Sequence, residues 1–133
     1  MSKISVVRKD LIYPELSYKI IGVLFSVFNE LGYGYRELYY QRALAAEFGH
    51  LGIVFREEVY CPVIFRNEII GRQRLDFLSE NKIILEIKQG DRLGRNDIMQ
   101  VMGYLRSAKL QLAILARFSN KGLIFRRILN LQD

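Results

Sequence analysis

The sequence contains one cysteine, Cys61, and one histidine, His50. A single cysteine excludes an intrachain disulfide and is typical of proteins from the reducing cytosol, so we expect a cytoplasmic protein. A lone histidine without further histidine or cysteine ligands does not predict a zinc site, and we interpret His50 as a helix-end or surface residue.

Long apolar segments are also missing. The opening residues, MSKISVVRKD, lack the apolar core of a secretory signal. The most apolar helical segment, residues 16–31, contains Lys19, Asn29 and Glu30 and is too short to span a bilayer comfortably. No repeat, linker or low-complexity stretch divides the 133 residues. We therefore expect a single domain, residues 1–133, with one sizeable core and no membrane partner.

Basic residues outnumber acidic ones, with 20 lysines and arginines against 14 aspartates and glutamates, a net charge of +6. Such a surplus favours polyanionic partners such as nucleic acid through counterion release. Many basic proteins bind no nucleic acid, however. Charge therefore suggests a partner but does not supply a reaction.

Apolar residues recur at helical spacing in three segments and form five strand-like runs. The helical segments span residues 14–31, 35–48 and 96–108, and the strand-like runs span residues 53–65, 68–78, 82–88, 110–118 and 122–129. The short gaps between the first three runs favour antiparallel hairpins. The predicted fold class is α/β, with a mixed central sheet flanked by helices.

Three charged residues stand out in the second and third strand-like runs. The third run, KIILEIK, carries Glu86 and Lys88, which share one face because side chains alternate along a strand. Asp76 lies near the end of the second run. If the loop between the runs has three residues and Asn81 takes a left-handed conformation, Asp76 lies directly opposite Glu86. A two-residue loop would instead place the two acids on opposite faces.

Two adjacent carboxylates repel each other unless a cation lies between them. Hard oxygen ligands favour Mg²⁺, with Mn²⁺ as a substitute. Lys88 could then hold an attacking water or balance the charge that grows on a phosphate during phosphodiester cleavage. On these residues alone a second interpretation stays open, a salt-bridge cluster on a solvated sheet face, because so short a motif often arises by chance.

Two further motifs accompany this set. The stretch GYRELYY has the pattern G-x-x-E-x-x-Y, and its Glu37 and Tyr40 share a face on the opening turns of the second helix. The stretch QVMGY places Gln100 and Tyr104 four residues apart on the third helix. We expect both to face away from the apolar stripe of that helix and to line a groove beside the strand ends.

Four tyrosines gather around the turn between the first two helices: Tyr33, Tyr35, Tyr39 and Tyr40. Their rings could stack on unpaired bases. Packing between the helices is the interpretation that we adopt.

These motifs, in this order, resemble those of the GxxExxY proteins of the PD-(D/E)xK nuclease superfamily, and the resemblance covers about residues 16–118. It implies a restriction-endonuclease-like αβββαβ core with a metal site on the central strands. It also implies a Mg²⁺-dependent nuclease that hydrolyses phosphodiester bonds of nucleic acid, with DNA as the expected substrate.

The resemblance further implies a set of metal ligands. Asp76 and Glu86 match the metal-binding acids of the superfamily, and the backbone carbonyl of Ile87 could complete the coordination. Glu37 matches an acid of the N-terminal helix that adds a ligand or orients a water. Mg²⁺ is the implied cofactor, with Mn²⁺ as a substitute.

The remaining roles follow from the same resemblance. Lys88 matches the catalytic lysine, Gln100 the glutamine that supports the active site, and Tyr104 the tyrosine that contacts substrate or the edge of the site. Four arginines are expected to contact phosphate, two after the third strand and two on the second: Arg92, Arg95, Arg72 and Arg74.

Two other functions stay open. A catalytically silent module could keep the nuclease fold and bind nucleic acid with steep salt dependence. A structural or regulatory protein would instead form a stable complex with another protein. A nuclease of this size has no separate DNA-binding domain, so we also allow for a homodimer.

Overall fold

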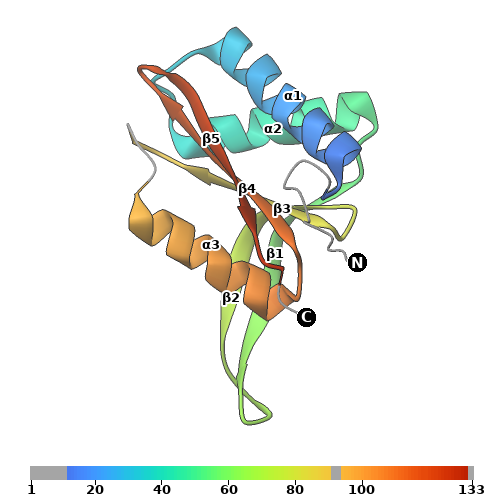
Figure 1. Ribbon diagram of the computed structural model, residues 1–133. Coiled ribbons are helices and arrows are strands. Elements are labelled where there is room, and N and C mark those ends of the chain that lie inside the picture. The colour runs from blue at the N-terminus through green and yellow to red at the C-terminus, as the bar shows by residue number, and fades with distance from the viewer. Residues whose placement is uncertain (1–11, 91–93, 132–133) are drawn as a thin grey trace, which may run out of the picture.

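The computed structural model describes residues 12–90 and 94–131 (Figure 1). Three helices and five strands follow one another in the order expected from the sequence. They are α1 (Pro14–Leu31), α2 (Glu37–Leu51), β1 (Phe55–Phe65), β2 (Glu68–Ser79), β3 (Ile83–Lys88), α3 (Arg95–Ala108), β4 (Leu112–Ser119) and β5 (Gly122–Leu129). None of the helices within these ranges combines the length and the apolar character needed to cross a membrane.

The strands form one mixed sheet in the order β1-β2-β3-β4-β5. Only β3 and β4 are parallel, and α3 connects them. Helices α1 and α2 lie together on one face of the sheet and α3 lies on the other (Figure 1). The predicted α/β class, with a restriction-endonuclease-like arrangement, is confirmed.

Helix α2 begins two residues later and ends three residues later than the sequence pattern predicts. Its C-terminal limit is set by Gly52, which adopts a left-handed conformation with φ of 69°. Gly49 lies inside the helix and is not among the residues with a positive φ.

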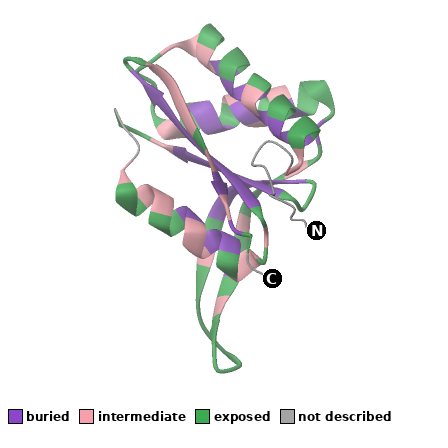
Figure 2. Cartoon of the chain, in the orientation of Figure 1, coloured by how far each residue is buried: buried purple, intermediate pink, exposed green. Residues whose placement is uncertain are grey.

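Two apolar cores lie on the two faces of the sheet (Figure 2). The larger core packs α1 and α2 against side chains such as Phe77, Leu85 and Ile87. The smaller core packs α3 against Ile84 and Leu115. Strands β3 and β4 are therefore buried on both sides, so any charged side chain on them lies in a place where desolvation is costly.

The turn between β2 and β3 fixes how these strands pair. Its three residues start with Glu80 and Asn81, which have φ of 52° and 56°. Phe77 then pairs with Leu85, which places Asp76 opposite Glu86. Of the two loops that the sequence leaves open, the structure has the three-residue loop with a left-handed Asn81, for which facing acids are predicted.

The part of β2 that precedes Phe77 pairs with β1 and no longer with β3. This part of the β1–β2 hairpin projects from the molecule as a two-stranded ribbon (Figure 1). The backbone turns sharply at Glu58, which faces Asp76 across the hairpin and has φ of 51°. The turn breaks the alternation of side chains, so that Phe77 packs with α1 and α2 but Leu75 packs with α3. Pro62 lies on the outer strand β1, at the edge of the sheet, where a residue without a backbone N–H is tolerated.

Candidate active site

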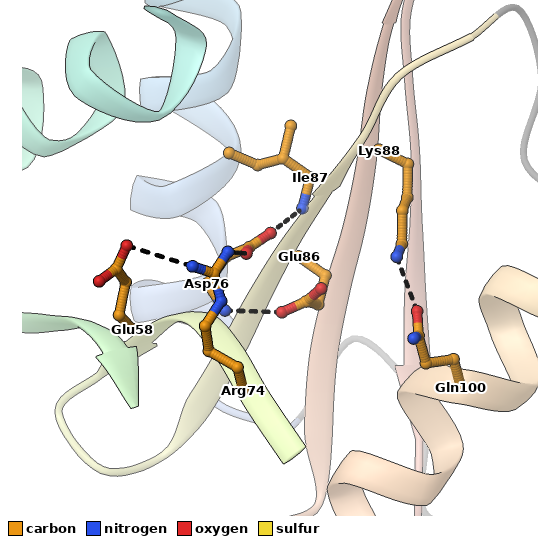
Figure 3. A network of polar contacts seen from close by, with 7 residues as sticks. All are labelled: Glu58, Arg74, Asp76, Glu86, Ile87, Lys88 and Gln100. Atoms are coloured by element: carbon orange, nitrogen blue, oxygen red, sulfur yellow. Dashed lines mark hydrogen bonds and ion pairs between the residues drawn. The ribbon is translucent and has the colours of Figure 1, made fainter. Parts of the chain in front are cut away.

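The two acids lie in the fork where β2 separates from β3. The Asp76 backbone N–H donates to Glu86 Oε1 at 2.7 Å, and the Ile87 N–H donates to Asp76 Oδ2 at 2.9 Å (Figure 3). Each carboxylate thus binds a backbone N–H of the other strand, just past Phe77 and Leu85, where the backbone pairing of β2 with β3 ends. These bonds fix both carboxylates at the branch point.

A cavity of about 240 Å³ opens at this fork. Strands β2 and β3 contribute most of its lining, α2 contributes its first residue, Glu37, and α3 contributes Tyr104. Its complete lining is Glu37, Arg74, Asp76, Glu86, Ile87, Lys88 and Tyr104. Residues far apart in the sequence therefore meet at one polar hollow.

The electrostatics of the cavity show an excess of negative charge among buried groups. Glu86 is only 3% exposed. Burial, followed by the neighbouring Asp76 carboxylate, raises the pKa of its carboxyl group to about 8 against the lowering effects of the Asp76 N–H and Lys88. Burial and Asp76 also raise the pKa of Glu37. A cation placed between these groups would be stabilised.

The donors at the fork suit a hard divalent cation. Asp76 and Glu86 offer carboxylate oxygens, and the Ile87 carbonyl is a further oxygen beside them. In the part of the chain that the structure describes, no three acidic, histidine or cysteine side chains are already gathered around one point. Water and substrate oxygens would therefore supply the rest of the coordination shell, as is usual for Mg²⁺.

Lys88 lies at the end of β3, half-buried, with its ammonium group turned toward α3. Its Nζ donates to Gln100 Oε1 at 2.6 Å (Figure 3). Gln100 is exposed on the first turns of α3. Tyr104, one helical turn further on, has its pKa raised to about 12 by burial and by the Glu86 and Asp76 carboxylates, so its hydroxyl keeps its proton. The helix thus places one amide and one hydroxyl donor beside the acids.

Arg74 bridges two acids on the hairpin side of the fork. Its Nη1 donates to Glu58 Oε1 at 3.1 Å and its Nη2 donates to Asp76 Oδ1 at 3.4 Å (Figure 3). The side chain is 41% exposed, which leaves the guanidinium open to solvent. Arg74 therefore offsets part of the negative charge and stays available to an anion.

Comparison with protein families decides the affiliation of the chain. Residues 14–128 match the family model described as the PD-(D/E)XK nuclease superfamily. This chain belongs to the PD-(D/E)XK nuclease superfamily. Members of the superfamily act on nucleic acid and generally use divalent metal ions.

The fold comparison points the same way for this PD-(D/E)XK chain. A solved structure described as the crystal structure of SSO0001 matches with a TM-score of 0.57 and 16% sequence identity. The match covers 95% of this chain and 61% of that chain, so this superfamily member spans less than two thirds of the length of the solved protein. At this identity the likeness shows the fold. No curated protein matches the sequence.

Most of the predicted site residues of this superfamily member meet at the fork. Those at the cavity are Glu37, Arg74, Asp76, Glu86, Ile87, Lys88 and Tyr104, with Gln100 bound to Lys88. Arg72 lies elsewhere, in a shallow groove on the projecting hairpin with Tyr60 and Ile70. Arg95 is exposed at the start of α3, outside the cavity lining. Arg92 lies outside the described residues.

The structure corrects the predicted orientation of Tyr104. Its ring does not face away from the apolar stripe of α3; it is 6% exposed and packs with Val101 and Leu105 in the smaller core. Residues 100 and 104 are about 400° apart around a helix, so a shared face was a sound expectation. The β1–β2 hairpin covers the face of α3 that carries both residues at Tyr104, whereas Gln100 on the same face remains exposed.

Sequence reasoning missed an ion pair behind the site. Arg117 on β4 pairs in register with Lys88, and its Nη2 donates to Asp97 Oδ2 at 2.6 Å. Asp97 also accepts the Gly94 N–H that opens α3, so Arg117 ties this helix end to the sheet. Gly90 passes over the guanidinium with φ of 113°, and a Cβ there would lie 2.5 Å from Arg117 Nη1. A lone arginine inside the apolar run LQLAILARF was the available signal.

The raised pKa of Glu86 predicts how the stability of the metal-free protein depends on pH. Its pKa of about 8 in the folded state exceeds the ordinary value of 4.5, so the folded state binds more protons than the unfolded state between these values. The contribution of Glu86 to stability is thus fully present below its ordinary pKa of 4.5, and it is lost as pH rises through the folded-state pKa of about 8. In EDTA, the unfolding temperature should fall by several degrees between about pH 6 and about pH 8.

Thermal unfolding followed by circular dichroism checks this expectation. Mg²⁺ should recover more of the unfolding temperature at the higher pH, because cation binding requires the ionised carboxylate. An unfolding temperature that rises over the same interval in EDTA, with no larger effect of Mg²⁺ at the higher pH, would show that Glu86 is not protonated in the folded state.

Proposed function

We propose that this chain is a Mg²⁺-dependent nuclease of the GxxExxY group that hydrolyses phosphodiester bonds of DNA. The observation that carries the proposal is the pair Asp76 and Glu86, which face each other in the fork, with Lys88 two residues after Glu86. Asp76 and Glu86 are 10 residues apart and face each other across the two strands. Two buried carboxylates in this arrangement lower stability unless a cation compensates them, which supports a functional role for the pair.

Asp76, Glu86 and the Ile87 carbonyl would hold the ion, and Glu37 would add a ligand or orient a water. When bound, Mg²⁺ or Mn²⁺ would lower the pKa of a water and neutralise charge on the scissile phosphate. The raised pKa values of Glu86 and Glu37 support this assignment, since burial and the Asp76 carboxylate raise them by more than the nearby cations lower them.

The remaining side chains would position the substrate. Lys88 would donate a hydrogen bond to the attacking water or to a phosphate oxygen, and Gln100 would hold its ammonium in place through the 2.6 Å contact. The protonated hydroxyl of Tyr104 would donate to the substrate at the edge of the site. Phosphates further along the strand would contact the four arginines Arg72, Arg74, Arg92 and Arg95.

A substrate comparison tests the proposal. Purified protein is incubated with labelled DNA and RNA of the same sequence, single-stranded, double-stranded and branched, with Mg²⁺ or Mn²⁺. Cleavage of DNA that exceeds cleavage of RNA would support the proposed substrate. Salt-sensitive binding without cleavage under any condition would contradict it and favour the catalytically silent binding module.

A homodimer is part of the proposal. Apolar side chains at the projecting tip of the hairpin are more than half exposed: Ile64, Phe65, Ile69 and Ile70. Exposed apolar patches of this kind mark protein interfaces, and a second copy would cover this one. Sedimentation should give twice the 15.6 kDa chain mass, and Ile70→Asp should reduce it to that mass. A monomer at micromolar concentration would remove the dimer.

A cytoplasmic location is also proposed. Cys61 is buried and forms no disulfide in the described part of the chain, which supports a reducing compartment. Cell fractionation tests the location, and recovery of the protein outside the cytoplasm would contradict it.

A further inference from the structure

Three of the four tyrosines around the turn between α1 and α2 do not serve as core packing. Tyr33, Tyr35 and Tyr39 are 57%, 49% and 45% exposed. Only Tyr40 is buried, where its ring stacks on Phe118 at a centroid distance of 4.2 Å. The interpretation of these tyrosines as packing between helices therefore holds for Tyr40 and is wrong for the other three.

Tyr40 instead fixes the shape of the turn. Its hydroxyl donates to the Gly32 carbonyl at 2.6 Å and accepts the Tyr35 N–H at 3.3 Å. The ring of Tyr35 meets that of Tyr40 edge to face, with centroids 6.1 Å apart. The hydroxyl of Tyr40 thus fixes the backbone at Tyr35, while the ring of Tyr35 remains half exposed.

Tyr35, Tyr39 and Arg36 form a small exposed cluster, which we call the tyrosine platform. The rings of Tyr35 and Tyr39 lie edge to face at 6.2 Å, and the Arg36 guanidinium lies 5.5 Å from the centre of the Tyr39 ring. Aromatic faces next to a guanidinium are the groups on which unpaired bases stack and by which their phosphates are held.

The platform lies at the rim of the cavity. Glu37, between Tyr35 and Tyr39 in the sequence, lines the cavity with Asp76 and Glu86. The platform also contacts the end of β3. Gln89, the residue after Lys88, donates its Nε2 to the Tyr35 carbonyl at 3.5 Å. A nucleotide whose phosphate is in the cavity would therefore have its neighbours within reach of the platform.

We propose that Tyr35 and Tyr39, with Arg36, stack an unpaired base next to the scissile phosphate, so that the substrate is single-stranded DNA or a single-stranded segment adjoining duplex. This inference rests on the proposed nuclease function and names its substrate class. Bases inside a duplex are already stacked on one another and offer no free face to the platform. Stacking also discriminates little among bases, so it selects for strandedness and not for sequence.

The absence of tryptophan allows a direct test of stacking. Tyr39→Trp introduces a single fluorophore on the platform, and Tyr18→Trp introduces one at the opposite end of α1, where Tyr18 is 80% exposed. Each variant is titrated with oligothymidine in EDTA, which prevents metal-dependent cleavage. Saturable quenching of Tyr39→Trp with little change in Tyr18→Trp is expected. Equal quenching of both, or of neither, would overturn the proposal.

Substitutions at the platform provide a second measurement. Tyr35→Ala and Tyr39→Ala should each raise the Kd for oligothymidine roughly tenfold, as expected for the loss of one stacked base. Tyr35→Phe and Tyr39→Phe should bind as the wild type does, because the ring remains, and Tyr18→Ala serves as the surface control. The proposal fails if the alanine variants bind as tightly as Tyr18→Ala, which would leave the platform as a surface for another protein.

The two proposals can fail separately. Saturable quenching without cleavage in Mg²⁺ would keep the platform and remove the nuclease. Cleavage by wild type and by the alanine variants at the same rate, on single-stranded and duplex DNA alike, would keep the nuclease and remove the platform.

Discussion

Glu86→Gln should reduce the rate of phosphodiester cleavage by roughly 1,000-fold or more. The substitution removes a charged ligand of the proposed metal ion, which would neutralise charge on the scissile phosphate. The same change should make the metal-free protein more stable at about pH 8. The amide is neutral, so the burial and the repulsion by Asp76 that raise the pKa of Glu86 no longer act against folding. Its oxygen can still accept the Asp76 N–H, which lies 2.7 Å away in the wild type.

Single-turnover cleavage in Mg²⁺ and thermal unfolding in EDTA measure the two effects on one preparation. Glu57→Gln is a matched control, since Glu57 is an exposed acid on β1 outside the cavity. An active Glu86→Gln variant would exclude Glu86 as a metal ligand. Loss of both activity and stability would show that Glu86 is a structural residue, because a metal ligand is expected to lose activity and to gain stability on this substitution.

Lys88→Ala should reduce cleavage by roughly 100- to 1,000-fold, the usual effect of removing one donor that stabilises transition-state charge. The carboxylates are held by backbone N–H groups and not by Lys88, so affinity for the metal should change little. Gln100→Ala should have a smaller effect, roughly tenfold, because it frees the ammonium without removing it.

Rates under single-turnover conditions, together with Mn²⁺ affinity measured by electron paramagnetic resonance, separate these effects. Lys121→Ala controls for the loss of one positive charge, since Lys121 is exposed in the turn between β4 and β5. If Lys88→Ala cleaves as fast as Lys121→Ala, Lys88 takes no part in the reaction. A larger effect for Gln100→Ala than for Lys88→Ala would reverse their proposed roles.

The pairing of Asp76 with Glu86 could be predicted from the sequence because it depends on local chemistry. Loop length and the tolerance of Asn81 for a left-handed conformation fix the register, and register fixes which side chains face each other. The motif residues that share a helix face or a strand face follow the same short-range geometry. Short-range geometry thus accounts for Glu86 and Lys88 on one strand, whereas Glu37 and Gln100 reach the site through the packing of α2 and α3 against the sheet.

Other features depend on how elements pack in three dimensions. Glu58 has a positive φ at the level of Asp76, where the hairpin leaves the sheet, yet no glycine or proline marks that position. The burial of Tyr104 and the pairing of Arg117 with Asp97 depend on where α3 lies across the sheet. Of Tyr35, Tyr39 and Tyr40, only Tyr40 is buried, because its ring stacks on Phe118 of β4, and this tertiary contact is not marked in the sequence.

The central claim is that the fork between β2 and β3 catalyses metal-dependent cleavage of DNA. The most direct test is to incubate wild type and Glu86→Gln with labelled linear, circular and single-stranded DNA in Mg²⁺ and in EDTA. We predict products for the wild type in Mg²⁺, none in EDTA, and none for Glu86→Gln in either. Cleavage by wild type in EDTA, or equal cleavage by Glu86→Gln in Mg²⁺, would contradict the claim.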